Sequence, residues 1–243
     1  DSARLTSAGD VCRWARADSA SMRTLLDLVL PLECAGCGVP GEHWCTVCSL
    51  ALFVPPIAVR PRVDPGVPCW SLGTYSGPRR SGVIALKERG RRSVARPFGR
   101  ALAEAVGHLR DAGEIDPPEL SSLILICAPS RARAARARGG DPVLRCARIA
   151  AEQLAPERVL RMTGGVRDSV GLSAGQRQHN VAGRIEAVGV AGPRAGARVT
   201  GSADFTVLLI DDVVTTGATL AESARVLTDF GVPVAGALVV ASA

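Results

Sequence analysis

Apolar runs alternate along the chain with segments whose apolar positions recur at helical spacing. Continuous apolar runs of five to eight residues are typical of strands buried on both faces of a parallel sheet. The candidate strands span residues 69–75, 123–127, 158–162, 206–210 and 234–241. The candidate helices span residues 82–87, 93–110, 143–154 and 219–230. Strands that alternate with helices predict an α/β fold, with a parallel sheet flanked by helices.

Three local patterns refine this prediction. Asp141 followed by Pro142 is typical of an N-cap and a first helical residue, so we expect a helix to begin there. Prolines are concentrated over residues 55–68, which predicts a linker or an irregular surface crossing. Residues 163–203 are rich in Gly, Arg and Ser and show weak periodicity. A segment of that length inside a compact domain is typical of a functional loop or lid.

The composition is that of a folded chain of moderate size. Of the 243 residues, 47% are hydrophobic and 3% are aromatic, so we expect a core built from Leu, Val, Ile and Ala. The length fits one α/β domain with a small module attached. We expect a disordered extension over residues 1–21, a small module over residues 22–55 and the α/β domain over residues 56–243.

No part of the sequence indicates a membrane protein. The longest clean apolar stretch, at residues 123–129, is much shorter than the roughly 20 residues that cross a bilayer. The first 21 residues lack the ordered regions of a signal peptide. We therefore expect a cytoplasmic protein without a membrane partner.

The formal net charge of +6 is compatible with nucleic-acid binding. Arginine is enriched along the whole chain, however, so arginine clusters are less informative than usual. Lys87 is the only lysine among the 29 basic residues. It is either retained for its chemistry or an ordinary surface residue, and the sequence favours neither.

Four of the eight cysteines form a compact motif. Cys34, Cys37, Cys45 and Cys48 make two CxxC pairs separated by seven residues, the arrangement in which four thiolates close a tetrahedron around Zn²⁺. Disulfides would require an oxidising compartment, and a thioredoxin-type CxxC does not fit the surrounding Pro and Gly residues. His43 is an alternative fourth ligand, although we expect it beside the site. The scattered Cys12, Cys69, Cys127 and Cys146 are interpreted as buried small hydrophobic residues.

The most informative segment is VLLIDDVVTTGATL at residues 207–220. An apolar strand leads into the adjacent carboxylates Asp211 and Asp212, and Thr215, Thr216, Gly217, Ala218 and Thr219 open a helix. A helix N-terminus favours a phosphate, and carboxylates at a strand end accept bonds from sugar hydroxyls or hold Mg²⁺. The segment therefore predicts a site for a ribose 5-phosphate group. The alternative is an ordinary strand-to-helix turn with a capped helix.

Gly217 is the residue of this turn that we expect to matter most for a phosphate. A Cβ there would block the approach of phosphate oxygens to the backbone N–H groups at the helix start. Because the turn is expected at the rim of the sheet, outside the core, replacement of Gly217 should spare the fold.

The chain resembles the type I phosphoribosyltransferases in the segment 207–219, and more specifically the ComF family, known from competence and DNA uptake. The double CxxC motif is part of this resemblance, and four longer segments carry it. These are LVLPLECAGCG at 28–38, LKERG at 86–90, APSRARAARARGGD at 128–141 and GLSAGQRQHNVAGR at 171–184. The resemblance implies a type I phosphoribosyltransferase-like sheet with a zinc module before it.

The resemblance also implies roles for individual residues. Asp211 and Asp212 would be the catalytic pair that faces the ribose of phosphoribosyl pyrophosphate (PRPP), bound with Mg²⁺. Thr215–Thr219 would hold the 5-phosphate, and residues 128–131, including Ser130 and Arg131, would lie near the pyrophosphate. Lys87 and Arg177 complete the implied set of phosphate-binding residues, and residues 163–184 would form a mobile loop over PRPP.

Two functions are compatible with the resemblance. The first is a phosphoribosyltransferase, in which a nitrogen nucleophile displaces pyrophosphate from PRPP. The second is a non-catalytic adaptor that works beside a helicase-like competence protein on single-stranded DNA, although the sequence offers no aromatic platform for stacking bases. Residues 138–142 read RGGDP, where family members commonly have RGFNQ, which affects recognition of the nucleophile. The sequence provides no N-terminal cysteine nucleophile for glutamine hydrolysis.

Overall fold

The computed structural model describes residues 32–130, 132–151, 159–163, 174–188 and 205–243. The extension expected over residues 1–21 lies outside the described residues, as does Cys12. Arg131 and residues 164–173, which belong to the segment expected to form a mobile loop, also lie outside them.

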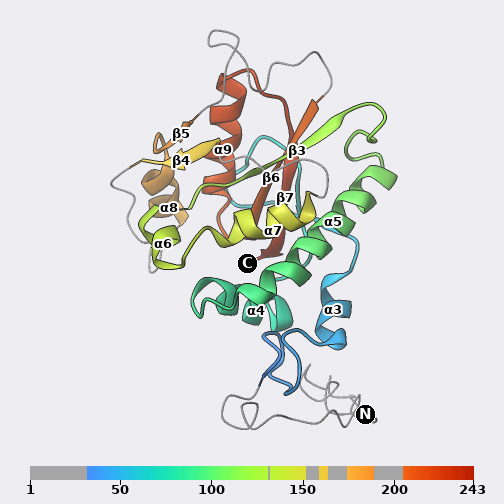
Figure 1. Cartoon of the computed structure of the whole chain (residues 1–243). Helices are drawn as coiled ribbons and strands as arrows, with labels where there is room; N and C mark the ends of the chain where they lie inside the picture. Colours follow the sequence, from blue (N-terminus) through green and yellow to red (C-terminus); the bar gives the residue numbers. More distant parts are fainter. Residues whose placement is uncertain (1–31, 131, 152–158, 164–173, 189–204) are drawn as a thin grey trace, which may run out of the picture.

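A five-stranded sheet forms the centre of the molecule (Figure 1), with the strand order β1–β2–β7–β6–β3. Its strands are β1 (Ile57–Ala58), β2 (Cys69–Ser71), β3 (Ser122–Cys127), β6 (Phe205–Val214) and β7 (Val234–Ser242). β2, β7, β6 and β3 are parallel to one another, and β1 pairs antiparallel with β2. The sheet is therefore mostly parallel, as the alternating pattern predicts.

Helices cover both faces of this sheet. The described helices are α3 (Thr46–Leu52), α4 (Gly77–Lys87), α5 (Ala95–Asp111), α6 (Ala132–Ala137), α7 (Pro142–Ala150), α8 (Ala174–Val181) and α9 (Ala218–Asp229), with a 3₁₀ turn at Arg92–Val94. The expected α/β architecture, a largely parallel sheet flanked by helices, is confirmed at this level. No described helix has both the length and the apolar character needed to cross a bilayer.

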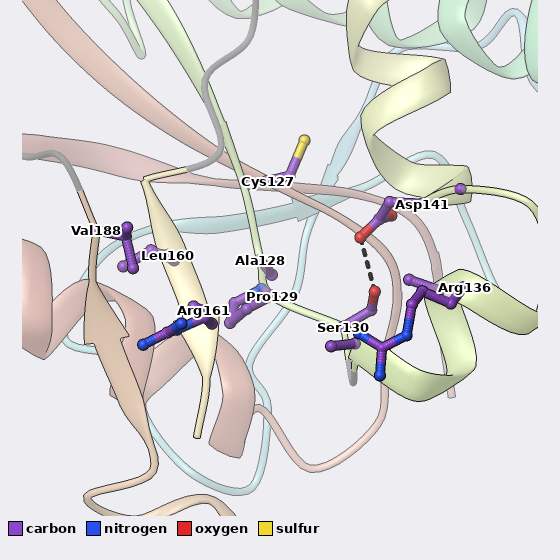
Figure 2. A pocket seen from close by; sticks show the side chains of 12 residues that line it. Cys127, Ala128, Pro129, Ser130, Arg136, Asp141, Leu160, Arg161 and Val188 are labelled. Carbon is purple, nitrogen blue, oxygen red and sulfur yellow. Dashed lines mark hydrogen bonds between the residues drawn. The ribbon is translucent and has the colours of Figure 1, made fainter. Parts of the chain in front are cut away.

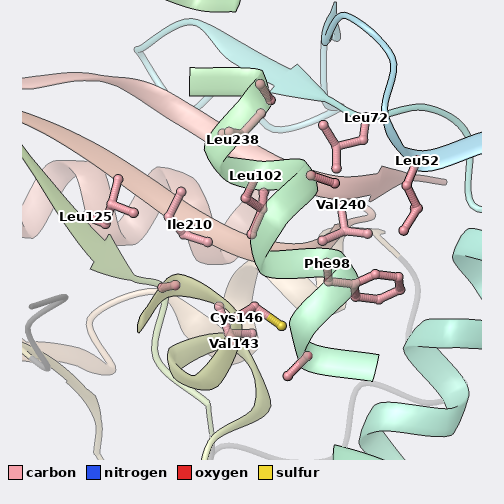
Figure 3. Packing of buried hydrophobic residues seen from close by; sticks show 14 of the residues in the cluster. Leu52, Leu72, Phe98, Leu102, Leu125, Val143, Cys146, Ile210, Leu238 and Val240 are labelled. Atoms are coloured by element: carbon pink, nitrogen blue, oxygen red, sulfur yellow. The ribbon is translucent and has the colours of Figure 1, made fainter. Parts of the chain in front are cut away.

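The two faces of the sheet have separate cores. On β6, Leu208 and Ile210 belong to a core with α4, α5 and α7, whereas Val207 and Leu209 belong to a second core with α9 and a small sheet. This alternation follows from the two-residue period of a strand. Figure 3 shows the first core, where Phe98 and Leu102 of α5 pack above the strands. The absence of aromatic side chains from most of these positions agrees with the expected aliphatic core.

A small second sheet joins a predicted strand to the segment that the sequence predicts to be irregular. β4 (Leu160–Met162) pairs antiparallel with β5 (Ile185–Ala187), and α8 lies between them in the chain. The expectation of weak structure throughout residues 163–203 is therefore wrong for α8 and β5. Each is short, and α8 is mostly polar, so neither shows the periodicity on which the prediction depends.

The boundaries of several other elements differ from the sequence prediction. α4 begins at Gly77, five residues before the predicted start, and β2 ends at Ser71 instead of residue 75. β6 continues beyond Ile210 because Val213 and Val214 pair with the end of β7. The predicted N-cap is confirmed, since the Asp141 carboxylate accepts the N–H groups of Val143 and Leu144 at 3.0 and 3.4 Å.

Candidate functional site

Four cysteine sulfurs gather in the module that precedes the sheet. The Sγ atoms of Cys34, Cys37, Cys45 and Cys48 all lie within 4.8 Å of one another. Among the described residues, this is the only group of three or more His, Cys, Asp or Glu side chains with that spacing. His43 is exposed and lies outside the group. The arrangement is consistent with the predicted structural zinc site.

The surroundings of the four sulfurs also fit a metal. The backbone N–H of Cys45 donates to the Cys34 sulfur at 3.2 Å, the type of bond that stabilises a thiolate ligand. A Cβ at Gly36 would lie 2.6 Å from the Cys48 sulfur, so only glycine leaves room for that turn. A hydrogen bond from the Cys48 thiol lowers the pKa of Cys34 to about 4, against the opposing effect of burial. One thiolate is therefore available even before a cation displaces the remaining thiol protons.

The acidic pair lies within β6, not beyond its end. The Asp212 N–H donates to Asp211 Oδ1 at 2.8 Å, and the Val213 N–H donates to Asp212 Oδ1 at 2.7 Å. The expectation that the strand stops before these carboxylates is therefore corrected. The local bonds explain why two adjacent acidic residues are tolerated in a strand, since each carboxylate accepts the N–H of the residue that follows it.

Lys87 contacts this pair directly. Its Nζ atom lies 2.5 Å from Asp212 Oδ2, and the side chains of Lys87 and Asp212 are 35% and 8% exposed. Burial opposes the charge on Lys87, but the carboxylates of Asp212 and Asp211 outweigh this and raise its pKa. The lysine therefore remains protonated and supplies the counter-charge that a buried carboxylate requires.

Asp211 has a different electrostatic state from its neighbour. Burial, and then the charge of Asp212, raise the pKa of Asp211 well above its usual range, although Lys87 opposes this. The raised pKa favours a proton on Asp211, and the Lys87 ammonium offsets the charge of the Asp212 carboxylate. Such a cluster offers donors and acceptors for sugar hydroxyls, whereas a bare divalent cation would compete with Lys87 for Asp212. The donor set does not support Mg²⁺ binding by these residues alone.

The threonine-rich turn is packed more tightly than the sequence suggests. Gly217 has a φ of 87°, in the left-handed region that favours glycine. A Cβ there would lie 2.5 Å from both Pro61 Cβ and the Val63 carbonyl oxygen. The Val63 N–H donates to the Thr216 carbonyl at 2.8 Å, so the turn and the segment at 61–63 are joined. The expectation that this turn is free of packing contacts is wrong, and Gly217 is required by the fold itself.

Two hydroxyls of the turn remain accessible to a ligand. Thr215 is exposed and Thr219 is partly exposed, whereas Thr216, Gly217 and Ala218 are buried. The Thr216 hydroxyl accepts the Ala218 N–H at 3.4 Å. Of the five predicted phosphate-binding residues, Thr215 and Thr219 therefore offer side chains on the accessible side of the turn.

A cavity of about 320 Å³ lies at the end of β3. Figure 2 shows Ser130, Arg136 and Asp141 along one side and Leu160, Arg161 and Val188 along the other. The Ser130 hydroxyl donates to Asp141 Oδ2 at 2.7 Å, so the residue that caps α7 also orients Ser130. Because Cys127 of β3 is paired with Ile210 of β6, the cavity opens beside the strand that carries the acidic pair.

The structure brings together some predicted residues and separates others. Lys87 joins Asp212, and Ser130 lines the cavity, but the acidic pair and the threonine turn do not line that cavity. Ala218 instead borders a second hollow of about 480 Å³, between α9 and residues 63–67. Arg177 is a residue of α8, and its side chain is outside the described parts. Of the two arginines in the cavity, Arg136 belongs to the segment 128–141 that the resemblance places near the pyrophosphate, whereas nothing in the sequence distinguishes Arg161 among so many arginines.

No family model matches the chain, and no curated protein matches it either. The assignment of function therefore depends on the geometry of these residues and on the resemblance of the sequence motifs.

Proposed function

We propose that this chain is a ComF-type protein that binds PRPP or ribose 5-phosphate with the residues at the carboxyl end of β6. The observation that carries the proposal is the acidic pair on a central parallel strand, followed by a left-handed turn into α9. Ligands of open α/β sheets bind outside the carboxyl ends of the strands. In this chain the carboxylates and the threonine hydroxyls lie within a few residues of one another at that end, and the Lys87 ammonium contacts Asp212 from α4.

The proposed ligand accounts for each of these groups. Ribose hydroxyls would donate to Asp212 and exchange hydrogen bonds with Asp211, which is suited to a neutral partner because its pKa is raised. The 5-phosphate would accept bonds from the Thr215 and Thr219 hydroxyls and from N–H groups at the start of α9. The pyrophosphate would extend towards the cavity beside Ser130 and Arg136, because a guanidinium pairs well with phosphate oxygens.

The reaction we propose is the transfer of the phosphoribosyl group to a nitrogen nucleophile. The nucleophile forms a bond to C1 of PRPP as the bond from C1 to the pyrophosphate oxygen breaks, and pyrophosphate leaves with the electron pair. Positioning, together with stabilisation of the leaving group by Arg136, would supply most of the catalysis, and Ser130, whose hydroxyl donates to Asp141, would shape the cavity beside it. Mg²⁺ would arrive with the pyrophosphate and supply further charge neutralisation. Zinc in the four-cysteine module would have a structural role.

Calorimetry tests the binding step. PRPP and ribose 5-phosphate should both bind, with PRPP weakened by EDTA, and Asp211→Asn/Asp212→Asn should lose at least tenfold in affinity, about 1.4 kcal/mol. Asp111→Asn is the matched control, because Asp111 is exposed at the end of α5. Equal affinity in the wild type and the double variant would refute the ribose assignment.

Pyrophosphate release from PRPP with a panel of amines and bases tests the transfer step. Release that depends on one acceptor would support a transferase. Tight binding of PRPP without release under any condition would instead favour the adaptor that assists a helicase-like partner on single-stranded DNA.

A further inference from the structure

Helix α4 connects the four-cysteine module to the acidic pair. It spans 11 residues, Gly77–Lys87, which corresponds to about 16 Å at 1.5 Å per residue. Contacts with the module occur along the helix and just beyond it, and its last residue reaches Asp212. Helix α4 therefore contacts both the four-cysteine module and the acidic pair on β6.

The first contact involves Trp44, the residue before Cys45. A Cβ at Gly82, in the middle of α4, would lie 2.9 Å from the Trp44 ring, so glycine allows the indole to lie directly on the helix. The same indole meets the Phe98 ring of α5 edge-on, with ring centroids 5.5 Å apart. Trp44 thus packs between α4 and α5, and its position depends on the turn that holds Cys45.

Two arginines bind the α4 region to the module, one on either side of the Trp44 contact. The Arg79 guanidinium, near the start of α4, donates to the carbonyl of Ala51 in α3. The Arg91 guanidinium, just beyond α4, donates to the carbonyl of Glu33, the residue before Cys34. The backbone of the cysteine module therefore accepts hydrogen bonds from both ends of the α4 region.

We propose that the four-cysteine module is the positioning device for Lys87. With a metal bound, the module holds α4 so that the Lys87 ammonium stays on Asp212; loss of the metal loosens α4 and releases the ammonium. Lys87 acts on the ligand through Asp212, as a positioning residue. The proposal describes the ligand-free protein, so it can fail while phosphoribosyl binding is real, and the reverse also holds.

The single lysine of the chain makes the contact measurable. Acetic anhydride labels Lys87 as the only side-chain amine, and peptide mass spectrometry separates it from the terminal amine. In the full-length, metal-loaded chain, labelling should be slow because the ammonium is paired and partly buried. The Asp212→Asn variant gives the labelling rate of a Lys87 that has lost its partner. Removal of the metal with a thiol reagent and chelator should raise the labelling rate of the wild type at least fivefold, towards the rate of that variant.

Hydrogen exchange on the same samples separates local release from unfolding. Metal removal should reduce the protection of residues 77–88 while α9 keeps its own. An unchanged labelling rate after complete loss of metal would overturn the proposal. Loss of protection throughout the chain would also overturn it, because the module would then support the whole fold and not one helix.

A variant that keeps all four cysteines provides the second test. Arg91→Ala removes the bond to the Glu33 carbonyl and should speed Lys87 labelling two- to threefold at unchanged metal content. Arg100→Ala is the matched control, since Arg100 is exposed on α5. Equal labelling rates in Arg91→Ala, Arg100→Ala and the wild type would contradict the proposal that the module positions Lys87 through α4.

Discussion

The four-cysteine module and the carboxyl end of β6 are assembled in opposite ways. All four sulfurs come from one stretch between Cys34 and Cys48, and two short turns bring them within 4.8 Å. The site at the end of β6 draws Lys87 from α4, Asp212 from β6 and a covering segment at 61–63 from the connection between β1 and β2. A local site depends on spacing alone, whereas an assembled site depends on the packing of the whole domain.

The largest loss of stability is expected when the four-cysteine site loses one of its ligands. Cys37→Ser should reduce bound zinc from about one atom per chain to none, because three thiolates do not close the tetrahedron. The metal contributes about 10 kcal/mol in sites of this kind, so the module should unfold while β6, β7 and α9 persist. Metal analysis and hydrogen exchange are the measurements. Cys69→Ser replaces a buried cysteine outside the group and should keep its zinc. Zinc retained in Cys37→Ser would contradict the four-sulfur site.

The next largest effect is expected at the turn between β6 and α9. Gly217→Val should cost about 3 kcal/mol, because a left-handed φ is penalised by about 1–2 kcal/mol and the side chain overlaps Pro61 and Val63. The ligand-free Tm should fall by about 6–12 °C. Gly107→Ala is the control, because a Cβ on that face of α5 meets nothing within 4 Å; it should gain up to about 1 kcal/mol. Similar Tm values for Gly217→Val and the wild type would show that the segment at 61–63 does not cover the turn.

A smaller, pH-dependent effect is expected at Asp211. Its pKa is raised in the folded protein, so the folded state binds a proton more tightly than the unfolded chain. Stability is therefore lost as pH rises from the ordinary aspartate range through the folded pKa, at about 1.4 kcal/mol per pH unit in that window. Asp211→Asn should abolish this loss and be more stable than the wild type at pH 8. Denaturant unfolding between pH 4 and pH 8 is the measurement, and parallel curves for the two proteins would count against a raised pKa of Asp211 in the folded state.

The smallest effect is expected at Ser130. Ser130→Ala removes the hydroxyl whose bond to Asp141 orients the segment beside the proposed pyrophosphate position, and a bond of this kind is worth about 1 kcal/mol. PRPP affinity should fall about fivefold, while ribose 5-phosphate, which lacks the pyrophosphate, should bind as before. Paired calorimetric titrations measure both affinities. Equal losses for the two ligands would place the cavity at the end of β3 near the 5-phosphate instead.

The difference between local and assembled sites also explains how much of the structure could be predicted from the sequence. The cysteine cluster and the Asp141 cap follow from residues close together in the chain, and both are seen in the structure. The long apolar strands follow from hydrophobic runs. The partners of Gly217 and Asp212 lie more than 120 residues away in sequence, and no local pattern encodes them. Sequence reasoning selected Lys87 because it is unique, but its contact with a carboxylate, and the tight packing around Gly217, emerge only from tertiary structure.

The short strand β1 also has a consequence for how the protein behaves in solution. It places only two residues, Ile57 and Ala58, along the outer side of β2, with Pro55 and Pro56 immediately before them. Proline has no N–H to donate, and so short a strand leaves little backbone for a neighbouring molecule to extend. Residues 55–58 thus hinder edge-to-edge pairing of the sheet with other molecules. A shortened chain that began after residue 58 would present the buried, apolar edge of the sheet to other copies, and concentrated samples of it would be expected to self-associate.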